Sequence, residues 1–398
     1  MLNHLQGCLL LAPLVVAALP AAAPAQTGQQ APAAQARRSR CLPQPYASPS
    51  YSHEVDLSPF LQCGGAATPF SIAYTPDGSR AYATLFGGLV GNGGCVVVRL
   101  DPQTLAVEAS ITSGESPEEL AFVTWPDGSM RLGFVTDSSS STVTVFDEFD
   151  QVVATIPIPF DPQATYATAF PYGLAVSPDQ SRVHVGTGDG QGFVHAIDVA
   201  TLSLDASARI DLGADHGAGR MAFAGELLVI PATEYLPNFT GSSAKVCVVD
   251  PLQPGVVRSL VLGSNSTGVL FPSLQDVAID CGGRAWLAGF DLGPRVFVVD
   301  PSAAGGPVLV RRVRTETSQS AGKFQGLGLS PDGILWVGDL YTAELSLIDV
   351  RRERWIETID PGQLPVSLVA PNEIAFSPDG SRAAVLWIAS ENITVFDL

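Results

Sequence analysis

Basic residues are scarce in this sequence, and apolar runs long enough to cross a membrane are missing. Lysine and arginine number 21 against 39 aspartates and glutamates, so the 398-residue chain has a formal net charge of −18. Nucleic-acid binding requires a basic face that neutralises phosphates, so this balance argues against a nucleic-acid partner. Because no apolar run reaches about 20 residues, the sequence predicts no membrane span.

Motifs for zinc binding, haem attachment and thiol redox chemistry are missing as well. The 5 histidines and 6 cysteines show no H-x-H, H-E-x-x-H or C-x-x-C spacing. Glycine and proline, in contrast, are abundant at 39 and 31 residues, while 46% of the chain is hydrophobic. This composition favours many short strands joined by tight turns over long helices.

The first 50 residues are predicted to lie outside the folded domain. Residues 1–25 have the features of a signal peptide, because Leu9–Leu19 is a short apolar run and Ala23–Ala25 offers a small-x-small cleavage site. No lysine or arginine precedes that run. Residues 26–50, rich in Ala, Gln and Pro, are predicted to be a disordered linker. We therefore expect an exported protein, periplasmic or extracellular.

One turn motif recurs along the rest of the chain. Pro69–Thr84 consists of an apolar run, a Pro-Asp-Gly turn and a second alternating run, which together predict a β-hairpin. Related turns occur in Trp125–Ser129, Ser177–Arg182, Ser330–Gly333 and Ser377–Arg382. Recurrence at a fixed spacing is typical of repeat architectures.

A second marker gives the number of repeats. An alternating strand ends in aspartate seven times, at Asp101, Asp147, Asp198, Asp250, Asp300, Asp349 and Asp397. Subtracting successive positions gives intervals of 46, 51, 52, 50, 49 and 48 residues. We interpret these aspartates as turn formers.

The repeats predict an all-β fold, a seven-bladed β-propeller of four-stranded antiparallel blades spanning residues 51–398. The last repeat stops after its third strand, whereas Ser52–Leu57 is an alternating strand that precedes the first repeat. We predict that Ser52–Leu57 pairs with Ile393–Asp397, which completes the last blade and closes the ring. Closure hides two strand edges that would otherwise promote aggregation.

The hairpin and the Asp-terminated strand resemble those of YVTN-type and lactonase-like β-propellers. Blades of that type carry a P-x-x-I/L-A-h-S-P-D-G-S-R-h-Y-V hairpin followed by a V-x-V-I-D strand, and the match covers residues 52–398. The fourth copy departs from the pattern, because Met221–Glu226 lacks the Pro-Asp-Gly turn. The resemblance implies the fold but no single function, since such blades serve both binding scaffolds and enzymes.

Polar residues are expected to ring the channel mouth, where the first strand of each blade begins. Directly before the first-strand anchors come Ser71, Glu119, Gly173, Arg220, Asp276, Gly326 and Glu373. One position earlier come Phe70, Glu118, Tyr172, Gly219, Gln275, Gln325 and Asn372. Carboxylate oxygens suit Ca²⁺ or another divalent cation, so Glu119, Asp276 and Glu373 are candidate metal ligands. Alternatively, these acids pair with Arg220.

Two of the residues near this mouth suggest catalysis. His216, four residues before Arg220, could act as a base, and Arg220 could stabilise developing negative charge. The composition is similar to that of the gluconolactonase/senescence-marker propellers, and this resemblance implies a divalent ion in the channel. It gives the alternative function, a metal-dependent lactone hydrolase.

Long connections with aromatic residues suggest binding instead. The segments 160–171, 231–244 and 263–274 are predicted to be loops over blades three to five on the channel face. A sixth aromatic, Tyr172, follows the first segment, and the candidate binding residues are Tyr166, Phe170, Tyr172, Tyr235, Phe239 and Phe271. Alternatively, these aromatics fold inward and cover the blades.

These patterns favour an exported, non-catalytic scaffold that binds a protein or a small molecule at its channel face. No cofactor is required by this interpretation, and we expect a monomer. Export permits disulfides, and Cys63 and Cys95 both lie toward the channel face, so we predict that they pair.

Overall fold

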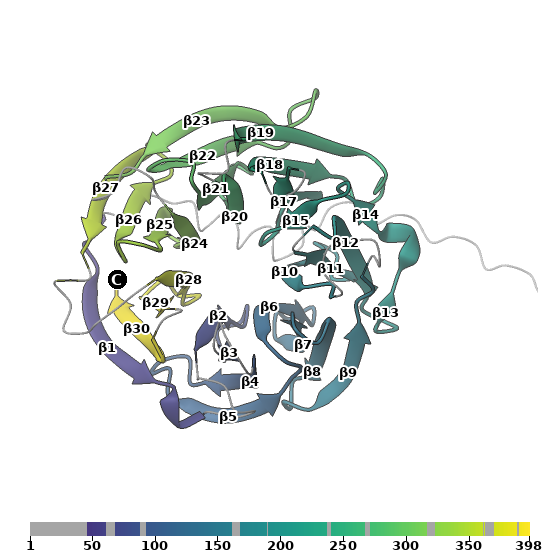
Figure 1. Cartoon of the computed structure of the whole chain (residues 1–398). Coiled ribbons are helices and arrows are strands. Elements are labelled where there is room, and N and C mark those ends of the chain that lie inside the picture. The colour runs from purple at the N-terminus through teal and green to yellow at the C-terminus, as the bar shows by residue number, and fades with distance from the viewer. Residues whose placement is uncertain are drawn as a thin grey trace, which may run out of the picture.

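The strands of the chain form antiparallel sheets that are arranged in a ring around a common centre (Figure 1). The computed structural model describes residues 46–60, 68–87, 93–160, 168–188, 190–236, 240–266, 271–316, 323–360, 362, 370–387 and 390–398. Within these ranges the strands form seven sheets, which confirms the predicted seven-bladed β-propeller. No described helix has the length and apolar character needed to cross a membrane.

The first three blades follow one another along the chain. Blade one contains β2 (Pro69–Tyr74), β3 (Ala81–Gly87), β4 (Gly93–Leu100) and β5 (Val107–Thr112). Blade two contains β6 (Pro117–Thr124), β7 (Met130–Asp137), β8 (Thr142–Asp147) and β9 (Val152–Pro157). Blade three contains β10 (Pro171–Val176), β11 (Arg182–Thr187), β12 (Phe193–Asp198) and an outer strand split into β13 (Ser203–Leu204) and β14 (Ile210–Asp211).

Blade four has its inner strand split instead. It contains β15 (His216–Ala218), β16 (Ala222–Ala224), β17 (Leu227–Tyr235), β18 (Ser242–Val249) and β19 (Val257–Asn265). Blade five contains β20 (Ser273–Ile279), β21 (Ala285–Phe290), β22 (Arg295–Asp300) and β23 (Val308–Arg314). Blade six contains β24 (Phe324–Leu329), β25 (Ile334–Asp339), β26 (Leu345–Asp349) and β27 (Arg354–Ile359).

Blade seven combines the two ends of the described chain. Its strands are β28 (Pro371–Phe376), β29 (Arg382–Trp387), β30 (Asn392–Asp397) and β1 (Ser50–Asp56). β1 pairs antiparallel with β30, with Glu54 opposite Thr394. The predicted closure of the ring by the N-terminal strand is therefore confirmed. Tyr46 and Ser48, which lie in the segment predicted to be a linker, both contact the Glu357 carboxylate of β27.

The recurring turn motifs form the hairpins that were predicted from them. In blade one, Asp77 Oδ1 accepts hydrogen bonds from the Ser79 N–H at 3.1 Å and the Thr75 hydroxyl at 2.6 Å. Gly78 then has φ +72°, a left-handed conformation that glycine adopts without strain. Third-strand aspartates also form turns, since Asp101 Oδ1 accepts from the Thr104 N–H at 2.7 Å.

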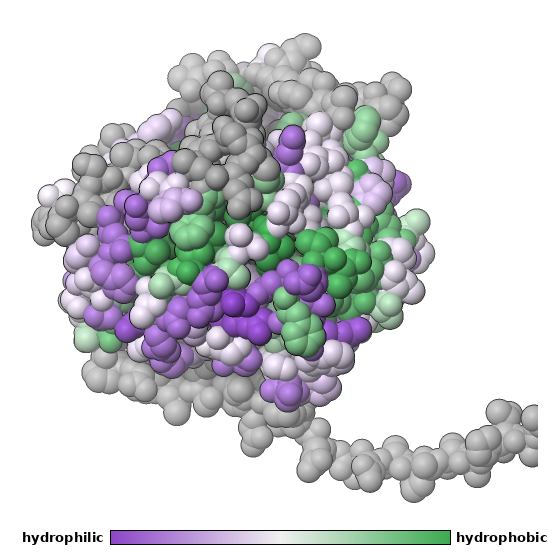
Figure 2. Space-filling model, turned by 90° about the horizontal axis from the view of Figure 1, so that it is seen from below, coloured by the Kyte–Doolittle hydropathy of each residue, from purple (hydrophilic) through white to green (hydrophobic). Residues whose placement is uncertain are grey.

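The apolar core lies between neighbouring blades rather than at one centre. Between blades seven and one, for example, Leu57, Ile72, Leu100, Leu386 and Ile393 form one buried cluster. The outermost strands are partly exposed to solvent, and Val152 and Val153 of β9 are 45% and 47% exposed. Figure 2 shows the molecule from below the orientation of Figure 1. On this surface an apolar band is bordered by hydrophilic side chains.

Candidate functional site

A β-bulge recurs in the first strand of the blades, at the positions that face the channel. The pairing of β2 with β3 shifts register between Pro69 and Ile72, and that of β6 with β7 shifts between Pro117 and Leu120. Equivalent shifts occur in β10, β20, β24 and β28, while blade four breaks its first strand at residues 219–221. Bulges redirect side chains, and here they place two successive positions of the inner strands, such as Glu118 and Glu119, near the centre of the ring.

The deeper of these two positions carries the charged ring, which we define as Glu119, Arg220, Asp276 and Glu373. Arg220 Nε donates to Glu119 Oε2 at 2.7 Å, and its Nη2 lies 2.7 Å from Glu373 Oε2. Nη1 donates to the Asn372 carbonyl at 2.9 Å and lies 3.5 Å from Asp276 Oδ2. The sequence-predicted carboxylates thus converge, but they converge on the guanidinium.

Burial controls the protonation of this ring. Arg220 and Asp276 are each 4% exposed. Burial raises the pKa of all three carboxyls, most strongly at Glu373, while the nearby Arg220 charge opposes that rise. Asp276 is held further by the Leu327 and Val277 N–H groups, at 2.9 and 2.7 Å. Three ionised carboxylates around one cation would leave a net charge of −2, and the raised pKa values of the carboxyls favour protonation that reduces this excess.

This arrangement does not fit a divalent cation. The space between the three carboxylates, where an ion would sit, is taken by the Arg220 guanidinium. Among the residues that the structure describes, no group of three or more His, Cys, Asp or Glu side chains could hold a metal ion. The charged ring matches the alternative stated from sequence, in which the acids pair with Arg220.

His216 has partners of its own at the start of β15. Its Nδ1 lies 2.8 Å from the Ala214 carbonyl, and the Lys245 ammonium lies 3.2 Å from its Nε2. A carbonyl only accepts and an ammonium only donates, so Nδ1 carries the proton and Nε2 accepts. Lys245 also pairs with Glu234 at 2.7 Å. The sequence did not single out Lys245, and its contact occupies the nitrogen that a general base would use.

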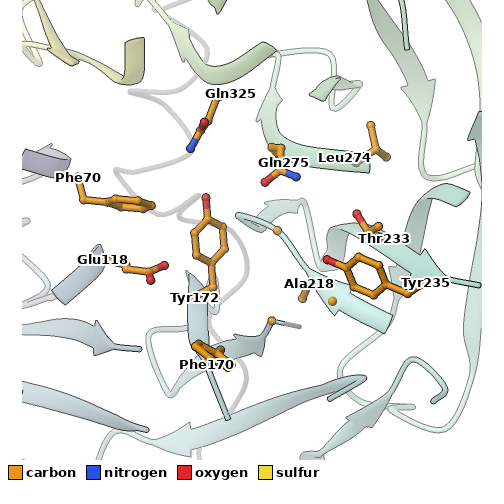
Figure 3. A pocket seen from close by; sticks show the side chains of 13 residues that line it. Phe70, Glu118, Phe170, Tyr172, Ala218, Thr233, Tyr235, Leu274, Gln275 and Gln325 are labelled. Atoms are coloured by element: carbon orange, nitrogen blue, oxygen red, sulfur yellow. The ribbon is translucent and has the colours of Figure 1, made fainter. Parts of the chain in front are cut away.

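Above the charged ring lies a pocket of about 250 Å³ on the channel face. Its base is the pocket ring, the second set of bulge residues, which we define as Phe70, Glu118, Tyr172, Gly219, Gln275 and Gln325. Its wall comes mainly from blades three to five and consists of Phe170, Gly188, Gly217, Ala218, Thr233, Tyr235 and Leu274. Figure 3 shows Tyr172 at the centre of this pocket, with Tyr235 directed inward from β17.

The aromatic side chains of the pocket ring also contact Arg220. The guanidinium carbon lies 5.7 Å from the Phe70 ring centre and 5.9 Å from that of Tyr172. The two rings pack edge to face, with centres 6.0 Å apart. Burial raises the pKa of Tyr172 far above its usual range, so its phenol remains a neutral donor. The charged ring therefore supports the base of the pocket directly.

The candidate binding residues divide into three groups. Phe170, Tyr172 and Tyr235 come together in the pocket. Phe271 lies apart from the pocket lining, 38% exposed, with its N–H donating to Asp291 at 2.9 Å. Tyr166 and Phe239 lie outside the described residues.

Two of the predicted loops are shorter than expected. β17 extends to Tyr235 and β18 begins at Ser242, because antiparallel pairing continues from Pro231 opposite Val246 to Tyr235 opposite Ser242. β19 likewise extends to Asn265. Tyr235 is therefore held on a strand, which fixes its position in the pocket more firmly than a loop would.

Two cysteines in the described residues are disulfide-bonded, namely Cys95 and Cys281. Cys63, the predicted partner of Cys95, lies outside the described residues. Cys247 is a buried free thiol, and burial raises its pKa to about 12. A thiol of this kind is a poor nucleophile.

No protein-family model and no curated protein matches this sequence. Solved structures with a similar fold include virginiamycin B lyase from Staphylococcus aureus, with a TM-score of 0.64 and 12% identity over 88% of this chain and 100% of that chain. Hydrazine synthase of Kuenenia stuttgartiensis has a TM-score of 0.62 and 18% identity over 83% of this chain and 96% of that chain.

The β-propeller domain of Myceliophteria thermophila Cps50 (Swd1) is a third, with a TM-score of 0.62 and 11% identity over 88% of this chain and 100% of that chain. Such likenesses support the β-propeller part of the sequence resemblance and show the fold alone.

Proposed function

We propose that this chain is an exported, non-catalytic binding scaffold that holds a ligand or partner at its channel face, chiefly over blades three to five. The pocket above the charged ring carries the proposal. It combines aromatic surfaces with the amides of Gln275 and Gln325, and concave sites of that composition commonly bind small molecules. Because most of the lining residues lie on strands or at bulges, the pocket is largely preformed.

The groups that the alternative, a lactone hydrolase, would require have other partners. Arg220 pairs with carboxylates and donates to the Asn372 carbonyl, and Lys245 contacts Nε2 of His216. Neither Arg220 nor His216 lines the pocket. These contacts favour structural roles for both residues and therefore favour binding over hydrolysis.

Export is supported by cysteine chemistry. Disulfides such as those of Cys95 and Cys281 persist in oxidising compartments and are rare in the cytosol. The N-terminal features of residues 1–25 agree with this proposal.

The pocket can be tested with ligand-observed NMR and a library of neutral, cationic and anionic fragments. Tyr235→Ala removes an aromatic wall, and we expect it to abolish the saturation-transfer signals of the fragments that bind the wild-type chain. Tyr341→Ala is the matched control, because Tyr341 is 61% exposed and does not line the pocket. Fragment signals that persist equally in both variants would contradict the proposed site.

A further inference from the structure

We infer that the ligand of the channel-face pocket is a neutral saccharide, one sugar ring in size. This inference rests on the proposed function, since it names the ligand class for the same pocket. It follows from three properties of the lining: its charge, the contact of its aromatic rings with Arg220, and its set of hydrogen-bonding groups.

The charge of the pocket excludes anionic ligands. None of the described residues that line it is lysine, arginine or histidine, whereas Glu118 is among them. Beneath it, the charged ring places three carboxyls around one guanidinium, and that guanidinium already has its partners. A phosphate or carboxylate entering here would lose its hydration without gaining a counter-charge, which is costly.

Organic cations are disfavoured by the position of Arg220. An ammonium ligand in an aromatic cage binds to the ring faces. The guanidinium of this chain already lies over Phe70 and Tyr172, at 5.7 and 5.9 Å from their centres. A ligand cation would have to share these ring faces with Arg220. The rings therefore suit a ligand that is uncharged.

The remaining groups match a sugar ring. A pyranose has an apolar C–H face, which packs on aromatic rings, and a rim of hydroxyls that both donate and accept. The Gln275 and Gln325 amides each donate one N–H within the protein, to Ser273 and Asn372 respectively, and each keeps a second N–H and its carbonyl oxygen. The Thr233 hydroxyl also donates and accepts, and a carboxylate such as Glu118 accepts from hydroxyls. Phe170, Tyr172 and Tyr235 supply the aromatic surface.

The volume sets the size of the ligand. Pockets for drug-sized molecules measure roughly 300–1,000 Å³. The pocket of about 250 Å³ lies below that range, so it accommodates a single ring better than an oligosaccharide. Gly188, Gly217 and Gly219 also line the pocket, and at Gly219 a Cβ would lie 2.6 Å from the Gln275 carbonyl oxygen, so the close packing of the inner strands requires glycine there.

Isothermal titration calorimetry on the full chain tests this inference. The probes are the methyl glycosides of glucose, galactose, mannose and N-acetylglucosamine, with methyl glucuronide as the anion and choline as the cation. We expect a neutral glycoside to bind, and its affinity to fall about 10-fold in Gln275→Ala, as expected for one lost hydrogen bond. Gln253→Ala is the control, because Gln253 is an exposed glutamine that does not line the pocket.

The outcomes separate the ligand class from the proposed function. Binding of choline or glucuronide in preference to every neutral glycoside overturns the saccharide inference, as does glycoside binding that Gln275→Ala leaves unchanged. If no glycoside binds but fragments still bind in a Tyr235-dependent manner, the ligand class is wrong and the proposed function stands. If fragment binding also fails to depend on Tyr235, both are wrong.

Discussion

At the scale of single residues, Arg220 joins parts of the chain that are far apart in sequence. It belongs to blade four, yet its guanidinium contacts Glu119 of blade two, Asp276 of blade five and Glu373 of blade seven. A buried cation in this position is stabilised by its carboxylate partners, and it stabilises their negative charge in turn. The arginine thus sets the electrostatic balance of the channel.

Replacing this arginine tests that balance. Arg220→Met keeps most of the side-chain volume but leaves three buried carboxyls without a cation, so we expect a loss of about 3–5 kcal/mol in the free energy of unfolding. Arg182→Met is the control, since the Arg182–Asp205 pair at 2.9 Å is partly exposed and should contribute about 1 kcal/mol or less. Urea unfolding of both variants measures the difference, and equal losses would contradict a special role for Arg220.

Two buried histidines make stability depend on pH. His184 is 0% exposed, and neither of its ring nitrogens has a hydrogen-bond partner among the described residues. Burial lowers the pKa of His184 and of His195 to about 4, from 6.5 in the unfolded chain. The unfolded state therefore binds protons first as the pH falls, so stability is full above pH 6.5 and decreases between pH 6.5 and 4.

The contribution of each histidine can be isolated by substitution. Between pH 7 and pH 5 we expect each to lower the free energy of unfolding by on the order of 2 kcal/mol. The variant His184→Met/His195→Met should show a correspondingly smaller decrease than the wild type, measured by urea unfolding at each pH. Comparing the two proteins cancels opposing groups such as Asp137, whose pKa burial raises to about 6. Identical pH profiles would show that the histidines are not protonation-sensitive.

At the scale of elements, β1 connects the start of the described chain to its last strand. Its pairing with β30 continues into Leu57, whose N–H donates to the Glu391 carbonyl at 2.8 Å. Leu57 is 0% exposed and packs in the cluster shared by blades seven and one. The closing strand is therefore anchored by burial at its C-terminal end as well as by backbone hydrogen bonds.

Removing that anchor should weaken closure. Leu57→Ala creates a cavity between two blades, and we expect a loss of about 2–5 kcal/mol in the free energy of unfolding. Leu252→Ala provides the control, since Leu252 is 83% exposed and should change stability by less than about 0.5 kcal/mol. Thermal unfolding and light scattering follow both variants. A Leu57→Ala protein as stable as the control would mean that closure does not depend on this contact.

The number of blades and the closure of the ring could be predicted because they follow from short-range patterns. Alternation and Pro-Asp-Gly turns recur locally, and Ser52–Leu57 was identified because it had no partner in its own repeat. The bulges could not be predicted in the same way, since a register shift depends on the neighbouring strand. What the sequence shows of the bulges is a recurring spacing between a proline and the first apolar residue of the inner strand, as between Pro69 and Ile72.

At the scale of the whole molecule, the candidate site was predicted only in part. The position of Glu119, Asp276 and Glu373 at the channel followed from the repeat, but their common partner did not. Arg220 is 101 residues from Glu119 in sequence, and only the closed ring brings these side chains together. The pocket ring was identified as a set of positions, whereas its combination with Tyr235 and Thr233 required the structure.

The pairing of β1 with β30 also determines when blade seven can be completed during synthesis of the chain. A ribosome completes β1 early and reaches Asn392–Asp397 only at the end of the described chain, so the sheet of blade seven cannot form until then. Until β30 has been synthesised, β1 lacks the strand of blade seven with which it pairs. A chain that stops before residue 392 therefore leaves β1 unpaired, and only a chain translated through β30 can form the complete ring.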